Sequence, residues 1–513
     1  MKNLKNINAL FILNRVIWLV CALVSLAGVR LALTNYVLNS DYYSSDNFYV
    51  LAFFHALRSG TLGSFHFSHL PDIFPEDFII IPLLALHVPW KLAFLTFSVL
   101  SVLAFLMAAC AILRRLRVDT AGQVLLIALL AGLAIVRDLV HLQFIVVGVH
   151  GGSFTLSFVM AAIAPRFLRR AGTVPALMLW NGVICLAVFS DALFIWEFVL
   201  PFISALVVMA LLGRLPWRAV AIMGMSAGSA TGLGMGLLHL LPISPFPPAS
   251  AGLLLERARL FVTSLGLELG LQLFAPLVVM LVLYMARFWF RPSGGKDGQD
   301  QEVGDPEVFF WHFGVTASLL SLALMVVAYE DLGTYRYATC ALWWPILLCV
   351  AAARDQISRL ARWFASASVV TLAACLMLAA ILPARSIFTE DLARCVEREG
   401  KNFPLKSGLG HYWVAHPVTL FTESRLVVSP LDGNVDPWMW LNNRTDYFTD
   451  DKMTTVRDYN FIFMRYMDSG VVQSRYGDPD GEIRCGDDRI LFYRDSKRLT
   501  DHVAQWLAAH PKD

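Results

Sequence analysis

Long apolar runs alternate with short polar segments over most of the chain. A helix needs about 20 mostly apolar residues to cross the hydrocarbon core of a bilayer. Runs of this kind predict about eleven membrane-spanning helices, near 13–33, 92–113, 121–136, 139–164, 174–189, 192–212, 218–240, 261–286, 308–328, 338–353 and 364–382. The pattern therefore predicts a polytopic α-helical membrane protein.

Three joins between these runs are tight. Arg137-Asp138 and Ser190-Asp191 each divide one long apolar stretch into two predicted helices. Prolines separate the short run 78–88 from the run that follows it. This short run cannot span a bilayer, so we expect an interfacial or re-entrant helix at the outer surface. If it crossed, the orientation of every later helix would invert.

Basic residues are concentrated in alternate loops, and cytoplasmic loops of membrane proteins are enriched in Lys and Arg. The segments that we assign to the cytoplasm carry Lys2, Lys5, Arg114, Arg115, Arg117, Arg166, Arg169, Arg170, Arg214, Arg218, Arg287, Arg291, Lys296, Arg354, Arg359 and Arg362. The other loops carry few basic residues. The bias therefore predicts a cytoplasmic N-terminus and an outer location for the segment after the last helix.

The composition agrees with this class. Of the 513 residues, 57% are hydrophobic and 16% are charged, and the mean hydropathy is +0.60. Soluble globular proteins rarely combine these values. A net charge of +2 without a massed basic patch argues against a nucleic-acid-binding protein. No small-residue cleavage site follows the first apolar run, which we interpret as a signal anchor.

The chain divides into two predicted domains. Residues 1–383 form the membrane domain, with a first outer loop over 34–90. This domain also contains the segment 291–307, which is rich in Gly, Asp and Gln and predicts a flexible cytoplasmic linker. Residues 384–513 have the length and pattern of a small domain with its own core.

Residues 384–513 predict an extracytoplasmic α/β domain. Short apolar strands and one helix alternate with turn residues, and they lie near 426–428, 461–464, 490–493 and 499–510. Cys395 and Cys485 are the two cysteines of this segment, and outside the cytoplasm they can form a disulfide. Two unrelated thiols are the alternative.

The first outer loop is acidic and aromatic, and it contains Asp41 and Asp46. A helix is expected over 45–58 because apolar residues recur on one face. Asp46 would lie in its first turn, where the helix dipole stabilises a carboxylate. Asp41 has no such structural role, and it is either a functional acid or an ordinary solvated one. His55 and Arg58 on the same helix are candidate substrate contacts.

Three residues with metal-binding side chains follow in this loop. His66, His69 and Asp72 recur at intervals of three, which on a helix would place them on one face. Pro71 and Pro75 argue against a regular helix at this position. A polar cap over the bundle is the simpler interpretation, so we assign no metal ligand and leave a divalent cation as an alternative.

A later outer loop, between the ninth and tenth predicted helices, contains Glu330, Asp331 and Arg336 beside Tyr335 and Tyr337. Tyrosine is common at membrane interfaces, whereas the orientation bias depletes arginine from outer loops. A guanidinium at this position suits a lipid phosphate, which it can bind through two parallel hydrogen bonds. Arg336 is therefore a candidate phosphate ligand, and its neighbours are candidate substrate contacts.

Several ionisable residues lie within predicted helices. Asp191, Glu197 and Glu268 fall in the outer halves of their helices, and charged groups at such depths usually face a polar cavity. We expect one cavity that opens to the outside, with Asp191 and Glu268 as candidate substrate contacts. His150 lies near mid-membrane beside two glycines, and we interpret it as a contact between helices.

Together these features resemble the GT-C superfamily of integral-membrane glycosyltransferases, which includes the aminoarabinose and protein-mannosyl transferases. The resemblance covers the architecture of the whole chain, and the segments VFSDALFIWEFVLP and GVHGGSF are similar to those of uncharacterised bacterial members. It implies a catalytic acid at Asp41 or Asp46 and a lipid-phosphate contact at Arg336. Many members have adjacent acids, whereas four residues separate these two, so which one acts stays open.

The resemblance implies inverting transfer of a sugar from a polyprenyl-phosphate carrier to a glycan, lipid or protein acceptor. The reaction would take place at the outer face of a bacterial cytoplasmic membrane, with Asp as general base and no certain cofactor. A transporter or flippase of a lipid-linked saccharide is one alternative, although no internal repeat supports it. A non-catalytic subunit of envelope assembly is another.

Overall fold

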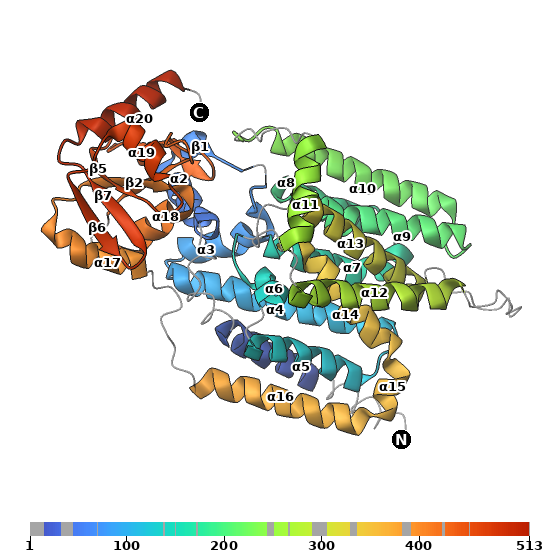
Figure 1. Ribbon diagram of the computed structural model, residues 1–513. Coiled ribbons are helices and arrows are strands. Elements are labelled where there is room, and N and C mark those ends of the chain that lie inside the picture. The colour runs from blue at the N-terminus through green and yellow to red at the C-terminus, as the bar shows by residue number, and fades with distance from the viewer. Residues whose placement is uncertain are drawn as a thin grey trace, which may run out of the picture.

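The computed structural model describes residues 15–31, 45–68, 70–136, 139–148, 150–170, 173–243, 251–264, 267–289, 305–328, 336–381, 391–422, 426–450 and 452–511. Within these ranges the chain forms a helical bundle and, at one end of it, a domain built around a small sheet (Figure 1). Asp41, Glu330, Asp331, Tyr335, His69 and most of the predicted linker lie outside the described residues.

The bundle has the character of a helical membrane protein. Five described helices are long and apolar enough to cross a membrane, namely α4 (Trp90–Arg115), α7 (Gly151–Arg170), α10 (Trp217–Leu238), α13 (Pro306–Ala328) and α16 (Ala361–Ile381). The other described helices of the bundle are 15–31, α5 (Thr120–Val136), α6 (Leu139–Leu142), α8 (Val174–Ser190), α9 (Leu200–Leu211), α11 (Ala251–Ser264), α12 (Leu267–Trp289), α14 (Thr339–Ala352) and α15 (Arg354–Arg359). Single turns are η5 (Gln143–Ile145) and η6 (Ile195–Val199).

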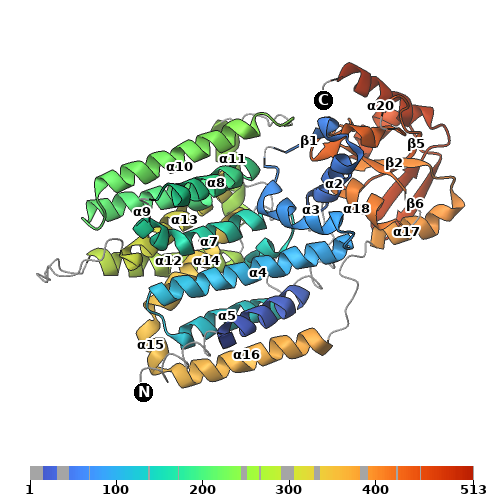
Figure 2. The ribbon, with the colours of Figure 1, turned by 180° about the vertical axis from the view of Figure 1, so that it is seen from behind.

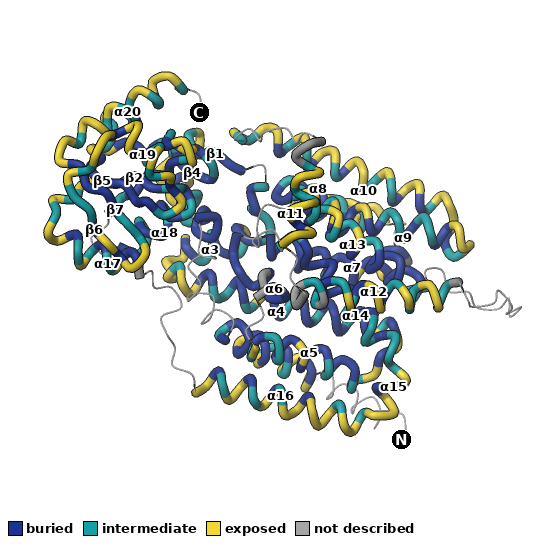
Figure 3. Tube along the Cα trace, in the orientation of Figure 1, coloured by how far each residue is buried: buried dark blue, intermediate teal, exposed yellow. Residues whose placement is uncertain are grey.

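Aromatic residues fill the centre of the bundle. Trp344 of α14 stacks on Phe158 of α7 with ring centroids 4.6 Å apart, and Trp343 meets Phe105 of α4 edge to face at 4.8 Å. Helices on the outside of the bundle instead expose apolar side chains. In α16, for example, only 22% of the most apolar 18-residue stretch is buried. Figure 3 shows this contrast between the buried centre and the exposed α16. A wide apolar outer surface is the form expected of a helix that faces lipid.

Two predicted runs are not single helices. The run 139–164 contains α6, η5 and then α7, so the prediction of one continuous helix over 139–164 is wrong. The backbone turns where Gly148 and His150 adopt φ values of 77° and 61°. A Cβ on Gly148 would lie 2.1 Å from the carbonyl oxygen of Asp46, so this turn requires glycine. The run 261–286 is divided between α11 and α12.

The first outer loop folds onto the end of the bundle that carries the C-terminal domain. Its elements are η2 (Ser45–Asn47), α2 (Tyr49–Ser59), η3 (Leu62–Ser64), β1 (Phe65–His66), η4 (Ile73–Asp77) and α3 (Phe78–Ala85). Figures 1 and 2 both show α2 and α3 between the bundle and that domain. The α3 helix has 8 residues, too few to cross a bilayer.

The C-terminal segment forms an α/β domain with a five-stranded sheet in the order β3-β2-β5-β7-β6. The strands are β2 (Ser407–His411), β3 (Val428–Leu431), β5 (Tyr459–Phe463), β6 (Gly481–Cys485) and β7 (Asp488–Phe492). β3, β2 and β5 run parallel, and β7 and β6 continue the sheet antiparallel. The helices and turns are α17 (Asp391–Glu399), η8 (Gly400–Asn402), α18 (Tyr412–Phe421), η9 (Arg444–Tyr447), α19 (Ser469–Tyr476) and α20 (Lys497–Ala509).

A covalent bond links two elements within this domain, and a second contact joins the domain to the first outer loop. Cys395 of α17 and Cys485 of β6 form a disulfide, with Cα atoms 5.7 Å apart. On the bundle side, β4 (Asn442–Asn443) pairs antiparallel with β1 of the first outer loop. The side chain of Asn443 also donates a hydrogen bond of 2.9 Å to the hydroxyl of Thr61. The C-terminal domain is therefore joined to the outer loop by backbone pairing as well as by side chains.

Candidate functional site

A group of charged residues is buried where the bundle, the first outer loop and the C-terminal domain meet. We call it the junction cluster. Its members are Asp46, Asp72, Glu76, Asp77, His150, Asp191, Glu197 and Arg336. All are buried except Arg336, whose side chain is 27% exposed. Charged groups are rarely buried in such numbers without a specific role, so this cluster is the candidate site.

Asp46 and Arg336 form one half of the junction cluster. Guanidinium Nη1 of Arg336 lies 3.7 Å from Oδ2 of Asp46. The hydroxyl of Tyr412, at the start of α18, donates a hydrogen bond of 2.9 Å to Oδ1 of Asp46. The hydroxyl of Ser45 in turn donates to the backbone carbonyl of Tyr412. The C-terminal domain thus covers Asp46, which is 7% exposed.

The position of Asp46 differs from the prediction. It lies in the separate turn η2 rather than in the first turn of α2, which begins at Tyr49. Ser45 does not cap α2, because its hydroxyl binds the C-terminal domain instead. Ser45 therefore makes a tertiary contact over 367 residues of sequence in place of a local hydrogen bond to the helix start.

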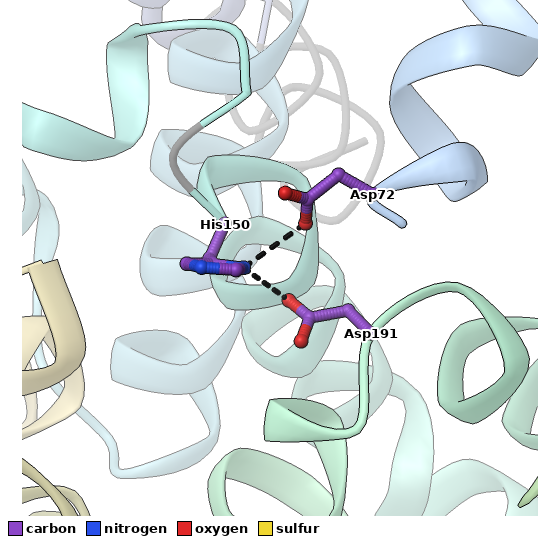
Figure 4. A group of neighbouring side chains, drawn as sticks. All are labelled: Asp72, His150 and Asp191. Atoms are coloured by element: carbon purple, nitrogen blue, oxygen red, sulfur yellow. Dashed lines mark hydrogen bonds and ion pairs between the residues drawn. The ribbon is translucent and has the colours of Figure 1, made fainter. Parts of the chain in front are cut away.

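His150, Asp72 and Asp191 form the other half of the cluster. Nδ1 of His150 lies 3.0 Å from Oδ1 of Asp72 and 3.0 Å from Oδ2 of Asp191 (Figure 4). The three residues come from separate elements: the segment before η4, the start of α7 and the end of α8. His150, interpreted from the sequence as a contact between helices, directly precedes α7 and binds the carboxylates of Asp191 at the end of α8 and of Asp72 in the outer loop.

Tyr337 connects the two halves. Its hydroxyl accepts a hydrogen bond of 3.4 Å from Nη2 of Arg336, and the guanidinium lies 5.2 Å from the ring centroid. The same ring lies 5.5 Å from the imidazole of His150. The ring of Tyr337 therefore lies between the Asp46–Arg336 pair and the His150 group.

Glu76 shapes the loop that carries His150. Its two carboxylate oxygens accept hydrogen bonds from the backbone N–H groups of Gly148, at 2.8 Å, and Gly152, at 3.1 Å. A Cβ on Gly152 would lie 2.9 Å from Cγ of Glu76, so the close approach depends on glycine. The carboxylate holds the backbone on both sides of His150.

Burial raises the pKa of the acids contributed by the first outer loop. For Asp46 the loss of solvation outweighs the opposing effects of Arg336 and of the Tyr412 hydrogen bond, and its pKa is raised. Burial together with the charge of Asp72 raises the pKa of Glu76 to about 8. Burial also raises the pKa of Asp77 well above its usual range. These carboxyl groups are stronger bases than solvated ones.

The structure gathers some of the predicted site residues and separates others. Asp46, Arg336 and Asp191 belong to the junction cluster, and Tyr337 contacts Arg336 and His150 between its two halves. His55 and Arg58 are exposed on α2 and do not enter the cluster. The placement of the Glu268 side chain lies outside the described part of the chain.

His66 and Asp72, which the sequence pattern would place on one helical face with His69, lie in different surroundings. His66 lies in β1, which pairs with β4, whereas Asp72 binds His150. Sequence reasoning missed Glu76 and Asp77 of the cluster and also Tyr412, which covers it, and none of the three belongs to a periodic pattern. A usable signal was present for the first two, because adjacent acids stand between Pro75 and an apolar run.

Comparison with known proteins identifies no relative. No family model, no curated protein and no solved structure matches this chain. The chemistry of the site is therefore argued from its own residues.

Proposed function

We propose that the chain is a membrane glycosyltransferase that moves a sugar from a polyprenyl-phosphate carrier to an acceptor hydroxyl. The observation that carries the proposal is the pair formed by Asp46 and Arg336. The sequence predicts an acid and a lipid-phosphate ligand in one site from two distant loops, and their side chains lie 3.7 Å apart. A buried acid beside a guanidinium provides both a base and a phosphate ligand.

The guanidinium of Arg336 has capacity for a further ligand. Among the described residues, its buried Nε has no hydrogen-bond partner. An unpaired buried donor is costly, and a phosphate oxygen would satisfy it. Arginine suits this role because its planar group can bind two phosphate oxygens at once.

The reaction we propose is a direct displacement. The acceptor hydroxyl gives its proton to the carboxylate of Asp46 while its oxygen forms a bond to the anomeric carbon. The bond from that carbon to the phosphate oxygen breaks, and its electron pair leaves with the lipid phosphate. Arg336 stabilises the negative charge that develops on the leaving group. The configuration at the anomeric carbon is inverted.

The raised pKa of Asp46 supports the role of base, because proton transfer is more favourable to a carboxylate of higher pKa. In the described conformation, Tyr412 covers this carboxylate. We infer that the acceptor reaches Asp46 when the C-terminal domain shifts from this contact. The substrate classes are then a lipid-borne sugar within the bilayer and a glycan, lipid or protein acceptor outside it.

The proposal includes the membrane arrangement predicted from the sequence. We propose eleven spans, a cytoplasmic N-terminus and an extracytoplasmic C-terminal domain in a bacterial cytoplasmic membrane. The alternating basic loops support this orientation. The grouping of α2, α3 and the C-terminal domain at one end of the bundle supports a common face for the proposed site.

Reconstituted protein tests the proposal. The wild type is expected to transfer sugar from a mixture of polyprenyl-phosphate sugars, and Asp46→Asn should reduce the rate by roughly 100- to 10,000-fold, the usual contribution of a general base. The Arg336→Ala variant should also lose binding of a polyprenyl phosphate without sugar, measured by native mass spectrometry. The matched control is Asp458→Asn, an exposed acid paired with Lys406.

Asp41→Asn, assayed beside these variants, shows which acid is the base. Wild-type transfer by both Asp46→Asn and Arg336→Ala would refute the assigned roles. Wild-type protein that moves the lipid-linked sugar across the bilayer without transferring it would instead support the flippase alternative.

A further inference from the structure

The geometry points to a divalent-cation site formed by Asp72, His150 and Asp191, with Mn²⁺ or Zn²⁺ as the bound ion. One imidazole and two carboxylates are a donor set that these first-row cations accept. The inference concerns cation binding and does not depend on the proposed sugar transfer.

The spacing of the three side chains fits one ion. Each residue offers a ligand atom, and these atoms all lie within 4.8 Å of one another. Nδ1 of His150 lies 3.0 Å from an oxygen of Asp72 and 3.0 Å from an oxygen of Asp191. Ligand atoms about 2.1 Å from a cation lie about 3.0 Å apart in octahedral coordination and about 3.4 Å apart in the tetrahedral coordination of zinc. An ion can therefore contact all three groups with small side-chain movements.

Hydrogen bonding alone satisfies this arrangement poorly. Nδ1 of His150 carries at most one hydrogen, yet it faces two carboxylate oxygens at equal distance (Figure 4). One hydrogen cannot point directly at both oxygens, and hydrogen bonds weaken as the angle narrows. A cation between the three atoms interacts with each of them through its lone pair.

The charge balance around the three residues also favours a cation. Two carboxyl groups, Asp72 and Asp191, face the single imidazole of His150, while the guanidinium of Arg336 pairs with Asp46. Buried carboxylates require compensating charge or protonation. A divalent cation with two carboxylates and a neutral imidazole is electrically neutral. Asp77, which is 2% exposed, has a buried Oδ2 without a partner among the described residues.

The backbone holds the ligands in place. Oδ1 of Asp191 accepts a hydrogen bond of 2.9 Å from the N–H of Leu193, which leaves Oδ2 directed to His150. The N–H of Asp72 donates a bond of 2.9 Å to the carbonyl of Ser190, directly before Asp191. Outer hydrogen bonds of this kind orient metal ligands in proteins. The cation would share the junction cluster with Arg336 and add positive charge beside the Asp46–Arg336 pair.

The test uses the full-length protein in nanodiscs, without an affinity tag, after treatment with a chelator. Mn²⁺ alone and Zn²⁺ alone are titrated, and the bound metal is counted by elemental mass spectrometry. We expect about one tightly bound ion per chain, with binding at least roughly 10-fold weaker in Asp72→Asn and Asp191→Asn. Glu197→Gln is the matched control, since this buried acid of the cluster binds Ser153 rather than His150.

Pulsed electron paramagnetic resonance of the Mn²⁺-loaded protein provides a second readout. We expect a nitrogen coupling from an imidazole ligand, and its loss in His150→Gln. Wild type without a tightly bound ion, or without the nitrogen coupling, overturns the inference, and so does unchanged binding in folded aspartate variants. If the variants do not fold, the wild-type stoichiometry and nitrogen coupling decide. None of these results depends on sugar transfer, so failure here and failure of the proposed function are distinguishable.

Discussion

Replacing Glu76 with alanine is expected to destabilise the protein by about 2 to 6 kcal/mol. The side chain is 1% exposed, and its two oxygens accept the N–H groups of Gly148 and Gly152. Truncation leaves both buried donors without an acceptor. Each unsatisfied buried group costs about 1 to 3 kcal/mol, and the two costs are added here. Any water that enters the space would bring the loss toward the lower limit.

Glutamine at this position separates hydrogen bonding from packing. The Glu76→Gln variant keeps the volume and one acceptor oxygen, but its amide nitrogen would face one of the two N–H donors. We therefore expect a loss of about 1 to 3 kcal/mol, half of the alanine effect. Both variants should also loosen the backbone around His150, which lies between Gly148 and Gly152.

The assay is equilibrium unfolding in mixed detergent micelles at increasing SDS fraction, followed by tryptophan fluorescence. Glu399→Ala is the control, because Glu399 lies on the exposed surface of the C-terminal domain and surface changes usually stay within about 0.5 kcal/mol. A Glu76→Ala variant that unfolds within that range of the wild type would refute the account of Glu76 as the acceptor that holds the His150 loop.

Two further predictions concern the C-terminal domain. Replacing Cys395 and Cys485 with serine should destabilise the domain by about 4 to 5 kcal/mol in the chain-entropy model, because the disulfide closes a loop with a sequence separation of 90. The loss of stability should appear as faster limited proteolysis of the full chain. An unchanged rate of proteolysis would contradict the prediction. Burial raises the pKa of Asp446 to about 6 despite the opposing charges of His55 and Arg457, so the folded state holds this proton more tightly than the unfolded chain. Stability should therefore fall as the pH rises from about 4 to 6, and Asp446→Asn should remove this slope from pH-dependent thermal melts; an equal slope in both proteins would refute the assignment.

The length and spacing of the apolar runs carried most of the information about the bundle. The predicted break at Ser190-Asp191 is confirmed, because α8 ends at Ser190. The break before α7 was missed, since it depends on the positive φ angles of Gly148 and His150 rather than on hydropathy. A count of apolar residues cannot detect such a turn when the residues on both sides are themselves apolar.

The sheet was predicted in part for a similar reason. β5 and β7 correspond to predicted apolar strands. β3 begins at Val428, two residues after the start of the strand predicted near 426–428. β2 was missed because its sequence, SGLGH, is rich in glycine and has little strand propensity. A Cβ on Gly408 would lie 2.0 Å from the ring of Phe461 in β5, so packing against a neighbouring strand selects the glycine. Such a requirement is visible only in three dimensions.

Stability alone does not account for the junction cluster. Removing two charges from water is costly, and well-packed apolar residues in place of a buried ion pair are often neutral or stabilising. The cluster instead collects six acids from the first outer loop, α8 and η6 around Arg336 and His150. Tyr412 closes this group from the C-terminal domain. All eight members of the cluster belong to the bundle and the first outer loop, and the C-terminal domain contributes the covering hydrogen bond from Tyr412. A shift of the C-terminal domain would therefore change the hydrogen bonding and solvation of Asp46 without dismantling the cluster. Under the proposed function, the substrate would replace the Tyr412 contact, and the polarity around Asp46 would change at the moment of reaction.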